Sequence, residues 1–573
     1  MAILNNSNAI SSGGYDINNS LRFRDSASAY LSRTPASAGN RKTFTWSGWV
    51  KKAKINDANG DMLFSGRTDD NNRDSFGFSP DAFQIFNVIG GTVTVNLTTT
   101  AVYRDPSSWY HFVISVDTTQ ATASNRVKIY VNGSQVTSFS NSTYPAQNEN
   151  FSFNNNILNY IAVYGYSTLG GYLDGYLTEI NFIDGQALTP SSFGETDTTT
   201  GVWKPKAYTS TYGTNGFYLK FSDIATTSGS NAGLGKDFSG NANYWNTNNI
   251  SVTAGTTYDA MTDSPTPTSA TVANYATLSP LIKTNTTLSS ANLQITTTGG
   301  AGSNQWTLCP ATIAPSSGKW YVEFYINTKT TDAGGSSIGI GLQSTNAMST
   351  YTSGNYLGQQ TTGEYNYQAH GYTYFNAVQS GTPVWASYTT GDTIGVAFDL
   401  DGLICYWYKN NTLQGSTSLI SGYSYAPAIS VYQASIASLN AGQRPFTYTP
   451  PTGYVRLNTY NLPDSTIKKG NTVMDATLYT GTSASLSVTN TAGFKPDFVW
   501  TKARSFGYDH GLFDSVRGVT KLLSSNSTAA ESTSANSLTA FNSNGFTVDA
   551  NGATGASGTT YVGWQWQAGQ GST

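Results

Sequence analysis

Apolar and polar residues alternate in short runs along most of this chain, and Gly, Asn, Asp and Pro break the runs. A period of two is typical of strands that bury one face, whereas an amphipathic helix repeats its apolar positions every three or four residues. Helical periodicity is almost absent. The pattern therefore predicts an all-β, multi-domain protein built of antiparallel β-sandwiches.

The most regular alternation lies in residues 391–411. Apolar side chains alternate on both sides of Asp401-Gly402, and glycine accepts the positive φ that a two-residue hairpin turn requires. The segment therefore predicts two strands around a tight turn. Asn132-Gly133 predicts a second such turn after the alternating run 127–131.

With 573 residues the chain is long enough for several domains, each with its own core. Residues 223–275 are rich in Asn, Thr, Ser and Pro, which predicts a connector that packs along a neighbouring sandwich through Tyr244 and Trp245. The predicted domains are a first sandwich at 1–222, the connector at 223–275, a second sandwich at 276–462 and a smaller β-rich module at 463–573.

Charged residues make up only 11 % of the chain, and 30 basic residues against 33 acidic ones give a net charge of −3. No basic block is present, which argues against nucleic-acid and anionic-membrane partners. No apolar run approaches the roughly 20 residues that span a bilayer, so we expect no membrane insertion. The two cysteines, Cys309 and Cys405, match no zinc pattern and are expected to be buried free thiols.

Five landmarks along residues 15–222 resemble, in order, those of the laminin G-like or concanavalin A-like jelly roll. They are Tyr30-Leu31-Ser32, Trp46-Ser47-Gly48-Trp49-Val50-Lys51, Trp109-Tyr110-His111-Phe112, the hairpin 127–133 and Leu173-Asp174-Gly175-Tyr176-Leu177. The resemblance implies two packed antiparallel sheets. It also raises the question of catalysis, because jelly rolls of this kind include β-glucanases.

Catalytic groups are not evident. Glucanases of this type carry carboxylates on alternate residues of one strand, so that acid and nucleophile face one groove. Asp174, Glu179 and Asp184 are five residues apart, and an odd spacing places neighbours on opposite faces of a continuous strand. The histidines lie in three different segments without a neighbouring nucleophile, at His111, His370 and His510. We therefore expect no enzyme, no catalytic residue and no cofactor.

A calcium loop is an alternative for the segment that starts at Asp70. Asp70, Asn72, Asp74 and Asp81 occupy the first, third, fifth and twelfth positions of such a loop. Ser75 stands where the loop needs glycine, and Asp81 replaces the bidentate glutamate. We therefore favour a polar hairpin loop and predict no metal site.

Residues 276–462 resemble SPRY domains. The motifs are the run 391–411, the entry strand Gly318-Lys319-Trp320-Tyr321-Val322-Glu323-Phe324, and the closing elements Gln443-Arg444-Pro445-Phe446 and Pro450-Pro451-Thr452-Gly453-Tyr454. SPRY domains bind partners through their loops and are not enzymes. The resemblance therefore implies recognition.

The last segment resembles a C-terminal module of structural proteins from tailed phages, notably marine ones. Its motifs are 493–502, Asp514-Ser515-Val516-Arg517-Gly518, 541–547 and Trp564-Gln565-Trp566. The order of the three modules resembles phage tail-fibre or virion-surface proteins. This resemblance implies assembly in the host cytoplasm into a virion, contact with other virion proteins, and a homo-oligomer, with a trimer expected.

Aromatic side chains with polar tips are abundant, with 37 Tyr and 12 Trp residues. Flat rings that cover the apolar face of a sugar, beside amides and hydroxyls, are typical of carbohydrate binding. We predict that a site for a host-surface glycan is lined by Tyr365, Tyr367, His370, Tyr372 and Trp385. In the alternative interpretation, Tyr365/Tyr367 and Tyr372/Tyr374 are strand pairs whose rings cover the core or face a neighbouring protomer. The alternative function is capsid decoration or another structural role in the virion without glycan binding.

Overall fold

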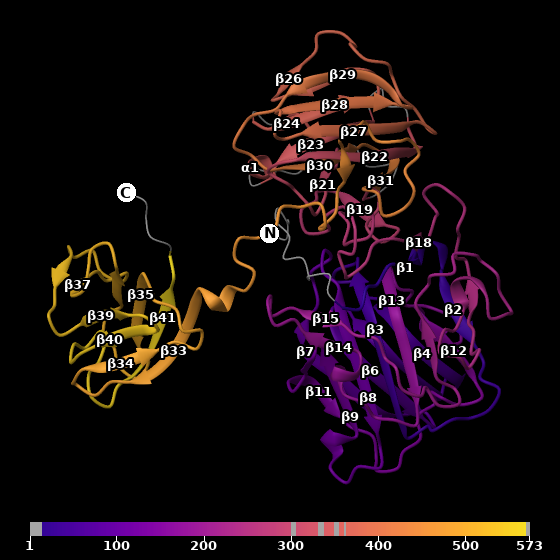
Figure 1. Cartoon of the computed structure of the whole chain (residues 1–573). Coiled ribbons are helices and arrows are strands. Elements are labelled where there is room, and N and C mark those ends of the chain that lie inside the picture. The colour runs from indigo at the N-terminus through magenta and orange to yellow at the C-terminus, as the bar shows by residue number, and fades with distance from the viewer. Residues whose placement is uncertain (1–13, 299–304, 331–336, 349–354, 360–361, 569–573) are drawn as a thin grey trace. The chain divides into compact units, whose positions relative to one another are not determined.

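A computed structural model of the chain confirms the all-β class with several antiparallel sheets (Figure 1). It describes residues 14–298, 305–330, 337–348, 355–359 and 362–568. The chain divides into two compact units, one of Met1–Asp197 with Val202–Asp464 and one of Thr198–Gly201 with Ser465–Thr573. No helix within the described residues is both long and apolar enough to span a bilayer.

The first sandwich consists of two eight-stranded sheets. One sheet contains, in spatial order, β10 (Ser134–Gln135), β9 (Val127–Val131), β8 (Tyr110–Asp117), β3 (Thr43–Lys52), β13 (Gly175–Asp184), β1 (Ser20–Phe23) and β18 (Ala260–Met261), with β16 (Phe217–Leu219) paired to β13. The other contains β11 (Phe139–Thr143), β7 (Thr92–Val102), β6 (Ala82–Ile89), β5 (Asn72–Ser79), β4 (Asp61–Asp69), β12 (Leu158–Ile161), β2 (Tyr30–Arg33) and β17 (Asn246–Asn248).

Alternate residues of both sheets meet in an aromatic core. Trp46 of β3 packs against Phe76 of β5 with ring centroids 5.1 Å apart, and Phe83 stacks on Phe112 at 4.4 Å. Asn132 and Gly133 both have positive φ between the paired residues Val131 and Ser134, which confirms the predicted two-residue turn.

The connector is part of this sandwich. Its strands β17 and β18 pair with β2 and β1 and so extend both sheets. Trp245 is 1 % exposed and lies against Phe217 at 5.0 Å, whereas Tyr244 is half-buried. A segment with a polar composition therefore contributes one large side chain to the core.

The second sandwich also consists of two sheets. The larger contains β19 (Thr286–Ser289), β20 (Gln294–Thr297), β31 (Ile436–Asn440), β22 (Lys319–Thr328), β27 (Thr393–Asp399), β28 (Ile404–Lys409) and β29 (Thr412–Ser418), with β32 (Val455–Arg456) parallel to β22. The smaller contains β21 (Cys309–Pro310), β30 (Tyr425–Val431), β23 (Ile338–Ser344), β24 (Glu364–Gln368), β25 (Thr373–Phe375) and β26 (Val378–Gln379). A short helix, α1 (Thr345–Met348), follows β23. Cys309 and Cys405 are buried free thiols, as predicted.

The predicted hairpin in 391–411 is β27 and β28, but its turn differs from the expected one. Asp399 pairs with Ile404, so four residues form the loop, and the positive φ falls on Leu403 instead of Gly402. The Asp399 carboxylate accepts the N–H groups of Asp401 and Gly402 at 3.1 and 2.8 Å. A Cβ at Gly402 would lie 2.8 Å from Asp399 Oδ2, so glycine is needed here for close approach.

The C-terminal unit has a smaller core. Its sheets are β33 (Met474–Thr480), β41 (Thr560–Trp566), β35 (Phe498–Ala503) and β36 (Gly511–Asp514), then β34 (Leu486–Thr489), β40 (Gly545–Val548) and β39 (Leu538–Asn542), and the pair β37 (Lys521–Leu522) and β38 (Ser532–Thr533). Val499 and Phe513 of the first sheet pack against Phe546 and Val548 of the second.

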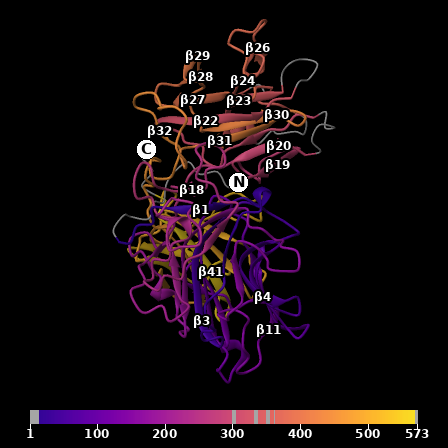
Figure 2. The ribbon, with the colours of Figure 1, turned by 90° about the vertical axis from the view of Figure 1, so that its right-hand side faces the viewer.

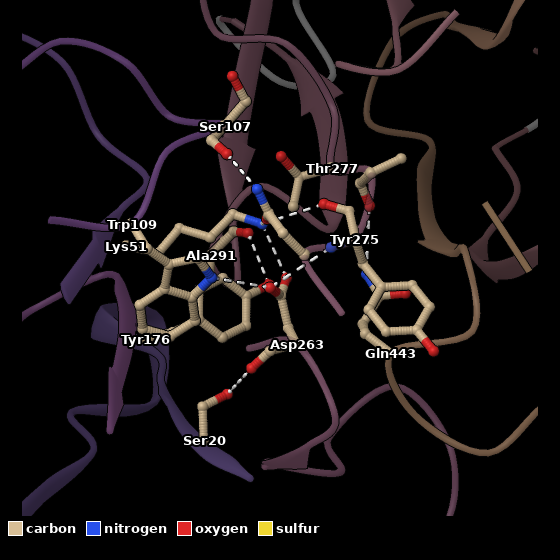
Figure 3. Close-up of polar contacts among 12 residues, drawn as sticks. Ser20, Lys51, Ser107, Trp109, Tyr176, Asp263, Tyr275, Thr277, Ala291 and Gln443 are labelled. Carbon is tan, nitrogen blue, oxygen red and sulfur yellow. Dashed lines mark hydrogen bonds and ion pairs between the residues drawn. The ribbon is translucent and has the colours of Figure 1, made fainter. Parts of the chain in front are cut away.

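Polar side chains join the two sandwiches of the first unit. β1 and β18 lie at the end of the first sandwich that is nearest to the second (Figures 1 and 2). Figure 3 shows Asp263, which follows β18, in contact with Lys51 and Trp109 of the first sandwich and Tyr275 at the start of the second. Nearby, the Tyr176 hydroxyl donates to the Ala291 carbonyl at 3.2 Å. The two sandwiches therefore share a buried, hydrogen-bonded junction.

Candidate ligand-binding surface of the second sandwich

Two of the predicted site residues belong to the core. Tyr365 and Tyr367 are 0 % exposed on the face of β24 that points into the sandwich. The Tyr365 hydroxyl accepts the Ile420 N–H at 3.1 Å, and the Tyr367 hydroxyl donates to the Ala386 carbonyl. Burial makes both rings unavailable to a surface ligand, which corrects this part of the prediction and agrees with the alternative that they cover the core.

Trp385 closes the edge of the same core. Its half-buried indole lies 5.0 Å from the Tyr367 ring and 5.3 Å from the Trp407 ring. A Cβ at Gly415 would come within 2.4 Å of Trp385 Nε1, so the absence of a side chain at this position of β29 leaves room for the indole. Trp385 therefore exposes only part of one ring.

His370 and Tyr372 are the predicted residues that the structure brings together at the surface. They flank Gly371 in the turn between β24 and β25, and their rings stack with centroids 4.3 Å apart. The Gly371 carbonyl accepts the N–H of Trp385 at 3.1 Å, so the segment of Trp385 adjoins this turn through its backbone. Whether His370, Tyr372 and Trp385 contact a ligand stays a prediction.

Four other aromatic side chains form a surface row that sequence reasoning did not assemble. Trp306 lies 5.3 Å from Tyr432 and 5.3 Å from Tyr356, and Tyr356 lies 5.3 Å from Tyr374, all between ring centroids. All four rings are half-buried. We call these residues the aromatic row.

The aromatic row lies on the outer face of the smaller sheet. Phe375 of β25 packs into the core against Trp407 at 5.6 Å, so its neighbour Tyr374 faces the opposite way. Trp306 forms a β-bridge with Tyr432, the residue directly after β30. This pairing places the Trp306 ring on the same side of the sheet as Tyr374. Because neighbouring residues of a strand face opposite ways, the sequence indicates that either Tyr374 or Phe375 faces outward. Nothing in the sequence near Tyr374 indicates that its ring lies close to Trp306.

Ser47 and His111 are in contact in the first sandwich, but the position of the imidazole proton prevents His111 from acting as a base toward Ser47. His111 Nε2 lies 2.8 Å from Ser47 Oγ, and Trp203 Nε1–H donates to His111 Nδ1 at 3.0 Å. Because Nδ1 accepts, the ring proton sits on Nε2 and is donated to Ser47. Burial lowers the pKa of His111 to about 3. The imidazole therefore cannot take the proton of Ser47.

The carboxylates considered for catalysis have separate partners. Glu179 accepts from the Tyr15 and Tyr218 hydroxyls at 2.8 and 2.7 Å, and burial raises its pKa to about 7. Asp174 accepts the Ala291 N–H at 2.9 Å at the junction of the sandwiches. Asp184 accepts backbone N–H groups of the loops beside β13. Each group thus has a structural role of its own.

The residues of the alternative calcium loop are likewise engaged elsewhere. Asp81 forms ion pairs with Lys52 at 2.7 Å and with Arg104 at 2.6 Å. Asp74 accepts the Phe153 N–H at 2.7 Å, and burial raises its pKa to about 8. Residues 70 and 71 form the turn between β4 and β5, as expected for a polar hairpin loop.

Two family models match parts of the chain. Residues 25–192 match the concanavalin A-like lectin/glucanases superfamily, which confirms the concanavalin A-like resemblance of the first sandwich. Residues 469–573 match a domain of unknown function, DUF7483. No curated protein matches the chain.

Solved structures with similar folds include SPRY domains and a pentraxin. The SPRY domain of human HERC1 is 16% identical over 30% of this chain and 99% of its own, with a TM-score of 0.24. A further human SPRY domain is 17% identical over 28% and 96%, with a TM-score of 0.22. The heptameric SAP-like pentraxin of Limulus polyphemus is 15% identical over 31% and 80%, with a TM-score of 0.24.

Proposed function

We propose that this protein is a carbohydrate-binding component of a phage virion, a tail fibre or adhesin that attaches to host-surface glycans. The aromatic row carries the proposal, because four adjoining half-exposed rings offer stacking faces for the apolar sides of successive sugars. The concanavalin A-like sandwich supports it as a fold used by lectins. The phage assignment rests on the resemblance of the module order.

The role proposed is binding without catalysis. The tautomer of His111 and the separate partners of Glu179 and Asp174 support this, because neither arrangement presents a nucleophile with a base. In the virion the chain contacts other virion proteins as a homo-oligomer, with a trimer expected. Incubation with a bound glycan should leave that glycan intact, as checked by mass spectrometry.

Glycan-array binding of the full-length chain tests the proposal, followed by titration of the best ligand. Tyr356→Ala and Trp306→Ala should each weaken binding at least tenfold, because each removes one stacking face. Tyr460→Ala is the matched control, since this ring is 47 % exposed outside the aromatic row. Equal glycan affinity in all variants, with unchanged melting curves, would refute the role of the aromatic row.

A second function is favoured by the surface of the C-terminal unit. Phe506, Leu478 and Val516 are 63, 61 and 85 % exposed, and Phe506 stacks on Tyr508 at 5.4 Å. A contiguous exposed apolar patch is typical of a surface that binds another protein, and Phe506 and Tyr508 are adjacent exposed rings. They favour decoration of a capsid or another structural role. Antibody labelling of particles distinguishes the two, because fibres would be labelled for an adhesin and the capsid shell for a decoration protein.

A further inference from the structure

A cleft of about 520 Å³ lies where the connector packs against the second sandwich. The connector contributes residues 254–257 to one wall. The second sandwich contributes Glu323 and Tyr325 of β22, Asn440 at the end of β31, and the segment 444–447. The volume is within the range of small-ligand sites.

Arg444 in the wall of this cleft is a buried cation that forms no ion pair with any residue that the structure describes. The residue is 4 % exposed, and its Nη1 has no hydrogen-bond acceptor among the residues that the structure describes. Four lysine or arginine residues are buried in the described part of the chain. The other three each pair with a carboxylate: Arg22 with Asp259, Lys51 with Asp263, and Lys52 with Asp81. Buried charges are normally paired, so Arg444 departs from the rule that the rest of the molecule follows.

The carboxylates nearest to Arg444 have other partners. Asp259 already binds Arg22 and Arg24 at 3.0 and 2.8 Å. Glu323 accepts the backbone N–H groups of Thr447 and Tyr448, each at 2.8 Å, and burial raises its pKa. Burial and repulsion from Arg22 lower the pKa of Arg444 to about 9, and attraction to Tyr176, Glu323 and Asp259 offsets only part of this shift.

The remaining lining suits a sugar. Tyr325 and Phe446 are half-buried rings, and Phe446 is held by an edge contact with Tyr321 at 5.1 Å. Hydroxyl and amide groups complete the walls, from Thr256, Thr257, Asn440 and Thr447. Rings with uncharged polar groups bind the sugar body, and a guanidinium binds a carboxylate through paired N–H donors.

We propose that this cleft binds an acidic saccharide, with Arg444 pairing with the sugar carboxylate and Tyr325 and Phe446 flanking the sugar ring. The saccharide class rests on the proposed function, whereas the anion recognition rests on Arg444 alone. The cleft is lined by β22 and β31 of the larger sheet, whereas the aromatic row lies on the outer face of the smaller sheet. The cleft therefore adds selection for acidic glycans to a surface that stacks on sugars of any charge.

Calorimetric titration of the full-length protein with digalacturonate tests the proposal, with its dimethyl ester as the uncharged analogue of the same size. The wild type should bind digalacturonate at least tenfold more tightly than the ester. Arg444→Gln should remove this preference while the ester binds as before. Tyr325→Ala should weaken both ligands together, because it removes ring contact and leaves the charge.

Two controls show whether the cleft acts independently of the aromatic row and whether it selects a saccharide over a simple anion. Tyr356→Ala in the aromatic row should leave the preference for the acid unchanged, so loss of the proposed function and loss of this site are distinguishable. Inorganic sulfate should bind at least tenfold more weakly than digalacturonate. Equal affinity for acid and ester, a preference that survives Arg444→Gln, or sulfate binding as tight as that of digalacturonate would each overturn the proposal.

Discussion

Lys51 Nζ lies 2.8 Å from Asp263 Oδ2, and this ion pair fastens β3 of the first sandwich to the part of the connector that leads into the second. Both side chains are buried, at 1 and 0 % exposed. Lys51 also donates to the Tyr275 carbonyl at 3.0 Å, and Trp109 Nε1–H donates to Asp263 Oδ1 at 3.2 Å (Figure 3). Both charged groups therefore have further hydrogen-bond partners besides each other.

Asp263→Ala should destabilise the first unit by about 3–5 kcal/mol, because it leaves the Lys51 ammonium buried without a counter-ion. Thermal unfolding monitored by tryptophan fluorescence measures the change. The double variant Lys51→Met/Asp263→Leu is the control and should recover most of the loss, since no unpaired charge remains. A double variant as unstable as Asp263→Ala would show that packing at this position matters more than charge.

Tyr367 and Tyr372 are close in sequence, but their substitution by alanine should lower stability by very different amounts. Tyr367→Ala removes a fully buried ring and should cost about 3–5 kcal/mol of stability, as large-to-small core substitutions of aromatic residues do. Tyr372→Ala alters a half-buried ring at a turn and should cost less than about 1 kcal/mol. Differential scanning calorimetry compares them. Equal melting temperatures would contradict the burial of Tyr367.

The sequence pattern predicted both hairpins, but it predicted the length of the turn correctly in only one of them. The Asn132-Gly133 turn has the expected geometry because asparagine and glycine both adopt positive φ readily. The turn at Asp401-Gly402 instead has four residues, because the Asp399 carboxylate binds the loop N–H groups and Lys319 holds that carboxylate at 3.0 Å. A prediction from the Asp-Gly dipeptide alone does not take such side-chain capping into account.

Long-range packing explains why the candidate site was only partly predictable. The spacing of Tyr365 and Tyr367 fits a strand, but the sequence does not say which face of that strand meets Trp407. Trp306 and Tyr374 are 68 residues apart and share the aromatic row because β30, β23, β24 and β25 follow one another in one sheet. The alternation of apolar and polar residues therefore predicted strands. The order of the strands in the sheet determines which aromatic rings are accessible to a ligand.

His111 should stay neutral and keep its proton on Nε2 throughout the pH range in which the protein is folded. Burial lowers its pKa to about 3, and the indole N–H of Trp203 occupies Nδ1. Long-range ¹H–¹⁵N NMR correlations of the imidazole nitrogens between pH 5 and 8 measure both properties. Trp203→Phe removes the donor to Nδ1 and should allow the second tautomer. A midpoint for His111 between pH 6 and 7 would contradict the burial.

Glu179 should make the first sandwich less stable as the pH rises. Burial raises its pKa from 4.5 to about 7, although the hydroxyls of Tyr218 and Tyr15 oppose the shift. The folded state therefore holds a proton that the unfolded state releases. The resulting stabilisation is complete below about pH 4.5, declines above it, and is lost once the pH passes about 7.

Glu179→Gln isolates this effect, because glutamine is uncharged and still accepts from the Tyr15 and Tyr218 hydroxyls. A shift from 4.5 to about 7 corresponds to about 3 kcal/mol. The unfolding free energy of the wild type, minus that of the variant, should therefore fall by about 3 kcal/mol between pH 4.5 and 8. Urea unfolding at intervals across this range measures the difference. A difference that is constant with pH would show that Glu179 has the same pKa in the folded and unfolded states, and one that rises would mean that the two tyrosine hydroxyls outweigh burial.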